Sequence, residues 1–163
     1  GIGKELQVRN VTDALTLAAD VDRFPSLAGL RRDYGSDKVE AMIAFYLLDL
    51  KKTVPVKNPP SAELIEVIAS EVLTEFWQLT MLGVHVSFRR VKHGHYGELY
   101  ESWNLPKVMT WFRSYFRERC ALAESESVNN TFQDSNDPRS SERMRQQFDM
   151  LEKKFNTTKK AAR

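Results

Sequence analysis

The chain has 163 residues, of which 42% are hydrophobic, and its formal net charge is +2. This hydrophobic content can supply a core, which excludes a wholly disordered chain. No apolar run approaches the roughly 20 residues that span a bilayer, so we expect no membrane partner. The single cysteine, Cys120, excludes an internal disulfide framework and is typical of a reducing compartment, which predicts a cytoplasmic protein.

The first part of the chain predicts three helices. Asn10 or Thr12 can cap a short first helix. The second begins at Pro25 and ends at Gly35. Ser36 then caps a longer helix, which we expect to be buried on most sides because its apolar residues occupy several faces. These residues are Val39, Met42, Ile43, Ala44, Phe45, Tyr46, Leu47, Leu48 and Leu50.

Three prolines between Val54 and Pro60 interrupt the helical pattern, because proline lacks a backbone donor and pushes the preceding residue into extended geometry. We therefore predict a connector between an N-terminal helical subdomain, residues 1–54, and a central helical subdomain, residues 61–124. Ser61 restarts a helix with a regular apolar face. This face consists of Leu64, Ile65, Ile68, Val72, Leu73 and Phe76.

Two more helices are predicted in the central subdomain. The first runs from Thr80 to Lys92 and stops at Gly94, although the alternating apolar residues over 84–88 also fit a strand. Asn104 caps the second. Its apolar face consists of Val108, Met109, Phe112, Tyr115 and Phe116.

The C-terminal part predicts a linker and one further helix. Residues 125–141 are rich in Asn, Ser, Asp and Gln, which is typical of a flexible linker. Residues 142–163 predict an amphipathic helix with a basic tail. Its narrow apolar stripe could pack on the body, pair with another chain through residues 142–156, or stay partly disordered. The stripe consists of Met144, Phe148, Leu151 and Phe155.

The predicted fold class is therefore all-α. We expect an irregular bundle of about six helices, with a flexible linker and a C-terminal amphipathic helix. No internal repeat interrupts this organisation.

Positive charge is concentrated in residues 83–120, which hold seven Lys or Arg against three Asp or Glu, and all three histidines. This excess permits an anionic partner without requiring one. Within it lies the segment Arg89–Tyr100, here called the basic corner, where cations end a predicted helix before a glycine-containing turn. Either its arginines bind phosphates and its tyrosines stack on bases, or its tyrosines pack and its arginines are solvated. The candidate residues are Arg89, Arg90, Lys92, Tyr96 and Tyr100.

Two further arginines lie on the helix that follows. Arg113 and Arg117 are four residues apart and share a face. With Lys107 they either extend the positive surface of the basic corner or form a solvated face that Glu118 partly compensates. We include Arg113 and Arg117 among the candidate nucleic-acid-binding residues.

Catalytic and metal-binding patterns are weak in this sequence. His93 and His95 have a His-x-His spacing that occurs among zinc ligands, with His85 one or two turns away, but a third and a fourth ligand are not evident. We predict no metal site and no cofactor. A Gly-rich phosphate loop, a Gly-x-Ser-x-Gly elbow and a His-Glu-x-x-His pair are all absent, so we expect a non-enzymatic protein.

One longer pattern spans the basic corner and the helix after it. Its members are Lys92, Gly94, Tyr96, Gly97, Leu99, Tyr100, Tyr115 and Arg119. The pattern resembles a signature of small proteins from prophages and mobile elements of Bacteroidetes-type bacteria, over residues 61–120. The resemblance implies a helical fold, a mobile-element setting and, by association with replication genes, an accessory role in DNA replication.

The sequence thus predicts a non-enzymatic helical module that contacts DNA or a replication protein. The alternative is a protein-interaction or oligomerisation module that uses the C-terminal amphipathic helix, residues 142–156.

Overall fold

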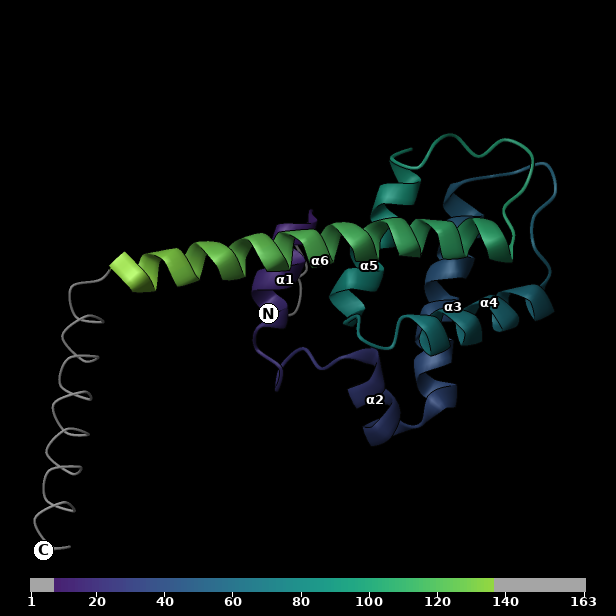
Figure 1. The fold of residues 1–163 in the computed structure, drawn as a ribbon. Coiled ribbons are helices and arrows are strands. Elements are labelled where there is room, and N and C mark those ends of the chain that lie inside the picture. The colour runs from purple at the N-terminus through teal and green to yellow at the C-terminus, as the bar shows by residue number, and fades with distance from the viewer. Residues whose placement is uncertain (1–7, 137–163) are drawn as a thin grey trace, which may run out of the picture. The chain divides into compact units, whose positions relative to one another are not determined.

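The computed structural model describes the backbone of residues 8–136 and the side chains of residues 8–129. Within these residues the chain forms six helices and no β-strand, which confirms the predicted all-α fold (Figure 1). In the same part of the chain, none of the helices has the length and apolar composition that crossing a bilayer requires. The helices are α1 (Val11–Ala18), α2 (Leu27–Tyr34), α3 (Ser36–Thr53), α4 (Ala62–Glu75), α5 (Met81–Lys92) and α6 (Leu105–Asn136).

Polar side chains begin four of these helices at predicted positions. The Asn10 carboxamide oxygen accepts a hydrogen bond from the backbone N–H of Asp13 at 2.8 Å, which caps α1. Ser61, Thr80 and Asn104 cap α4, α5 and α6 in the same way. Each cap satisfies a backbone donor that has no partner inside its helix.

The start of α2 and the start of α3 differ from the prediction. Pro25 precedes the cap of α2, which is Ser26, and the helix begins at Leu27. Ser36 is the first residue of α3 and makes no capping hydrogen bond. Gly35 alone separates the two helices, so Ser36 already has helical geometry where a cap would need an extended backbone.

The proline segment does not divide the chain into two subdomains. The described residues up to Leu122 form one compact unit, in which α3 packs on α4 and α5, so the predicted boundary is wrong. The segment itself is tied down by hydrogen bonds. The Lys51 ammonium donates to the Pro60 carbonyl at 2.9 Å, and the Asn58 N–H donates to the Glu101 carbonyl at 2.7 Å.

Aromatic rings from several helices meet in the core of this unit. Phe88 stacks on Tyr46, with ring centroids 5.5 Å apart, and meets the edge of Phe112 at the same distance. Phe76, directly after α4, lies 5.4 Å from Phe112. Burial of each such ring contributes about 1.5–3 kcal/mol, so these contacts hold α3, α5 and α6 together.

The helix α5 forms where a helix was predicted, and not the strand that was the alternative. Residues 84–88 are helical, and Val84, Val86 and Phe88 are all buried, because α5 is covered on nearly every side. The alternation that also fitted a strand therefore reflects an enclosed helix.

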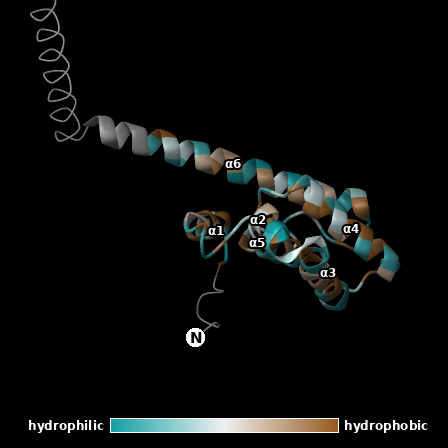
Figure 2. Ribbon diagram, turned by 90° about the horizontal axis from the view of Figure 1, so that it is seen from below, coloured by the Kyte–Doolittle hydropathy of each residue, from teal (hydrophilic) through white to brown (hydrophobic). Residues whose placement is uncertain are grey.

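By contrast, α3 is not buried on most sides. Its residues Met42, Phe45 and Leu48 are 45%, 69% and 48% exposed. Figure 2 shows hydrophobic and hydrophilic residues mixed along α3. One apolar side of this helix thus faces away from the core.

The last described helix, α6, continues through most of the predicted linker. It extends to Asn136, so the linker prediction is wrong for residues 125–136. Residues 107–137 contain neither Gly nor Pro, and Asn, Ser and Asp cost only about 0.7 kcal/mol or less each in a helix, so nothing stops α6 earlier. Residues 123–136 belong to a second unit. The predicted C-terminal helix, residues 142–163, lies outside the described residues.

Candidate functional site

The predicted nucleic-acid-binding residues lie on two helices and on the connection between them. Three of their five cations are paired with carboxylates of other helices, so they do not form one continuous free positive surface. In chain order the residues are Arg89, Arg90 and Lys92 on α5, Tyr96 and Tyr100 in the connection, and Arg113 and Arg117 on α6.

Arg90 joins α5 to α6. Its guanidinium donates two parallel hydrogen bonds to the Glu118 carboxylate, with N···O distances of 2.5 and 2.9 Å. The same guanidinium lies 5.7 Å from the ring centroid of Tyr115, and only 15% of the Arg90 side chain is exposed. These hydrogen bonds raise the pKa of Arg90 and lower that of Glu118. Arg90 is therefore part of a helix–helix contact and is not available to a phosphate.

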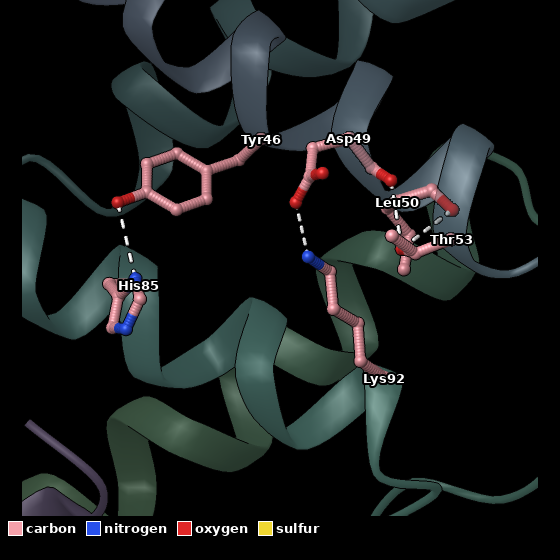
Figure 3. Close-up of polar contacts among 6 residues, drawn as sticks. All are labelled: Tyr46, Asp49, Leu50, Thr53, His85 and Lys92. Carbon is pink, nitrogen blue, oxygen red and sulfur yellow. Dashed lines mark hydrogen bonds and ion pairs between the residues drawn. The ribbon is translucent and has the colours of Figure 1, made fainter.

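Lys92 joins α5 to α3 through an ion pair with Asp49 (Figure 3). On the same two helices, the Tyr46 hydroxyl lies 3.4 Å from Nδ1 of His85. Burial lowers the pKa of His85, and the charges of Arg89 and Lys92 lower it further. Neutral His85 can then accept a hydrogen bond from the Tyr46 hydroxyl, whose own pKa is raised by burial and by Asp49. The ion pair and the Tyr46–His85 contact therefore stabilise the packing of α3 on α5.

Arg113 joins α6 to α4. Its guanidinium donates to both oxygens of Glu75, at 2.7 and 3.0 Å, which raises the pKa of Arg113. Arg117 lies one turn further along α6 and is exposed, as is Arg89 on α5. Among the described side chains, neither Arg89 nor Arg117 forms an ion pair. Only these two of the five predicted cations remain available to an anionic ligand.

The two tyrosines of the basic corner have different environments. Gly94 and Gly97 adopt positive φ angles of 73° and 93°, which only glycine accepts readily, and they form the predicted turn. Tyr96 is half-buried, and its hydroxyl is enclosed next to the Arg90 guanidinium. Tyr100 is 72% exposed. Tyr96 therefore packs, as one reading of this turn required, whereas Tyr100 can stack on a ligand.

The histidines do not converge. His93 and His95 are exposed, while His85 faces Tyr46 from inside the helix pair. Among the side chains of residues 8–129, no three of His, Cys, Asp or Glu gather as a metal ion requires. His95 instead meets the edge of the Tyr96 ring, with centroids 5.0 Å apart.

A second candidate site lies between α3 and α4, where sequence reasoning placed none. It is a groove of about 570 Å³, here called the α3–α4 groove, at which Phe45 and Leu48 are exposed. Apolar residues on every face of α3 were a usable signal, because a helix beside the surface cannot bury all of its faces. The groove is lined by Asp37, Glu40, Ala41, Ala44, Phe45, Leu48, Glu66 and Ala69.

No protein-family model, no curated protein sequence and no solved structure matches the chain. The resemblance to prophage and mobile-element proteins stays a prediction. The function is therefore inferred from the geometry of the two candidate sites.

Proposed function

We propose that the chain is a non-enzymatic helical module that binds another protein through the α3–α4 groove. The observation that carries this proposal is the exposure of Phe45 and Leu48 beside a groove of about 570 Å³. Large apolar side chains grouped on a surface mark sites where another molecule removes them from water. Aromatic anchors in such positions supply much of the binding energy of protein interfaces.

Covering this surface with a partner would be energetically favourable. Full burial of one Phe or Leu side chain contributes about 1.5–3 kcal/mol. Phe45 and Leu48 are three residues apart on α3, and Met42 lies one turn before Phe45, so one partner can cover all three. The small residues Ala41, Ala44 and Ala69 allow the partner to approach the helix backbones closely.

Contact with DNA is the second candidate, and it has less support. A phosphate-binding surface needs several unpaired cations on one face, because each released counterion contributes to affinity. Arg90, Lys92 and Arg113 have carboxylate partners within the protein. Exposed Arg89, Arg117 and Tyr100 favour this candidate. A replication protein of a mobile element, as the sequence resemblance implies, would fit the first candidate as a protein partner.

Selection from a displayed random-peptide library tests the protein-binding proposal. The full chain is the target, and enriched peptides are titrated against it by fluorescence anisotropy. We expect them to lose affinity for the Phe45→Ser/Leu48→Ser variant, with circular dichroism confirming that the variant is folded. The matched control is Tyr34→Ser, which removes an aromatic residue that is 62% exposed and lies outside the groove. Equal loss in both variants, or no enrichment, would contradict the proposal.

The DNA candidate is tested in parallel. Labelled single-stranded and double-stranded DNA are titrated at two salt concentrations against the full chain and the Arg89→Ala/Arg117→Ala variant. Salt-dependent binding that this variant weakens and Phe45→Ser/Leu48→Ser leaves intact would replace the protein-binding proposal.

A further inference from the structure

We infer that the α3–α4 groove binds an amphipathic helix that carries basic residues beside its apolar stripe. This inference rests on the proposed function and names the class of partner. It follows from the shape, the length and the charge of the groove.

The apolar part of the groove has the form that receives a helix. Ala41, Ala44, Phe45 and Leu48 occupy positions i, i+3, i+4 and i+7, so they form one stripe along α3. Ala69 of α4 forms the opposite side. A helix laid into such a groove presents one apolar residue per turn, which is the usual mode of helix-in-groove recognition.

The length of the groove sets the length of its partner. The lining residues of α3 extend from Asp37 to Leu48. At about 1.5 Å per residue, this distance is about 16 Å, or three helical turns. A partner helix of about 11–12 residues along α3 is therefore sufficient, with three or four apolar anchors.

The charge of the groove indicates the charge of its partner. Asp37 and Glu40 on α3 and Glu66 on α4 are its three ionisable lining residues, and all are acidic. Ser70 donates a hydrogen bond of 3.3 Å to one oxygen of Glu40, and a carboxylate can accept several more. Basic side chains flanking the apolar stripe of the partner would meet these carboxylates, whereas acidic ones would be repelled.

The positions of two of these carboxylates also indicate how the partner helix is oriented in the groove. Asp37 and Glu40 lie within the first five residues of α3, and the other end of the groove is the apolar Leu48. We therefore expect the basic residues of the partner to lie mostly at the end that meets the start of α3.

A focused library tests the charge. Displayed helical peptides of about 15 residues carry fixed apolar residues once per turn, and the flanking positions vary among Lys, Gln and Glu. After selection on the full chain, we expect Lys to exceed Glu by about two- to fivefold per position, as for exposed ion pairs. The preference should shrink at high salt.

Charge reversal of the target provides the control. Selection on Asp37→Lys/Glu66→Lys should favour Glu at the same flanking positions, because two of the three lining charges change sign. Glu71→Lys, an exposed position of α4 outside the groove, should leave the preference for Lys unchanged.

The outcomes separate this inference from the proposed function. Peptides that require Phe45 but show equal Lys, Gln and Glu would overturn the inference and leave the proposed function standing. No enrichment over the Phe45→Ser/Leu48→Ser target would overturn both. Light scattering of the full chain adds one further outcome: a dimer abolished by Phe45→Ser/Leu48→Ser would identify a second copy as the occupant and overturn the inference of a separate basic partner.

Discussion

Arg90 of α5 and Glu118 of α6 face each other in a two-pronged ion pair, on a helix face where the sequence suggested a phosphate contact. Glu118→Gln leaves the largely enclosed Arg90 without a counter-charge while keeping one acceptor oxygen. We expect this substitution to lower the free energy of unfolding by about 1–2 kcal/mol. Urea denaturation followed by circular dichroism measures the change.

The matched control for this prediction is Glu71→Gln on α4. Glu71 is exposed and has no ion pair among the described side chains, so its substitution should change stability by less than about 0.5 kcal/mol. Equal midpoints for the two variants would show that the pair between Arg90 and Glu118 does not stabilise the protein.

A second prediction concerns pH and His85. Burial and two nearby cations lower its pKa in the folded protein, whereas in the unfolded chain it is about 6.5. Above that pH, His85 is neutral in both the folded and the unfolded protein, and its full contribution to the free energy of unfolding is present. As the pH falls below it, the unfolded chain binds the proton first, and stability is lost until the folded pKa is reached. We expect the free energy of unfolding to decrease in this window.

Two variants separate the origins of this pH dependence. His85→Gln keeps an acceptor for the Tyr46 hydroxyl but cannot titrate, so it should flatten the loss between about pH 7 and 5. Glu118 has a lowered folded pKa and contributes fully above its unfolded value of about 4.3, with loss only at lower pH. Glu118→Gln should therefore reduce the loss of unfolding free energy that occurs at more acidic pH. If the free energy of unfolding of His85→Gln fell as steeply between pH 7 and 5 as that of the parent, His85 would not be the origin of this pH dependence.

A third prediction tests the close approach of α5 to α6 at Gly83. A Cβ placed there would lie 3.3 Å from both Cε1 and the hydroxyl of Tyr115, which is 1% exposed and cannot easily move. Gly83→Ala gains up to about 1 kcal/mol of helix propensity but overpacks the interface by about 1–3 kcal/mol. We expect a net loss of stability of about 1 kcal/mol, measured by thermal unfolding.

Tyr115→Phe provides the second half of a double-mutant cycle. It removes the hydroxyl that the new methyl group would meet, so Gly83→Ala should cost less in that background. Additive effects would show that the hydroxyl is not the source of the strain, which would then lie at Cε1 of the same ring or elsewhere in the interface.

Local sequence signals predicted most of the secondary structure. Asn10, Ser61, Thr80 and Asn104 are short polar residues placed just before apolar periodic segments, and each caps a helix where one was predicted to begin. The linker prediction failed over residues 125–136 because it depended on composition. Ser, Asn and Asp weaken a helix only slightly, so an established helix continues through them in the absence of Gly or Pro.

Long-range contacts explain why the site could not be predicted to the same extent. Arg90, Lys92 and Arg113 are separated from their carboxylate partners by 28, 43 and 38 residues, so no local pattern reveals that their charges are compensated. The sequence located the glycine turn correctly, because that turn depends on local features, but it left open whether Tyr96 and Tyr100 pack or are exposed. Which side of α3 the other helices leave uncovered is also a property of packing.

The last prediction compares Leu47 and Leu48, adjacent leucines of α3 with opposite environments. Leu47 is completely buried, so Leu47→Ala should lower the free energy of unfolding by about 2–5 kcal/mol through lost burial and a cavity. Leu48 is 48% exposed at the α3–α4 groove, so Leu48→Ala should cost less than about 1 kcal/mol. Because the amino-acid change is identical, helix propensity cancels in this comparison. Chemical denaturation of both variants measures the difference, and equally large losses would show that Leu48 is covered and that the groove is closed.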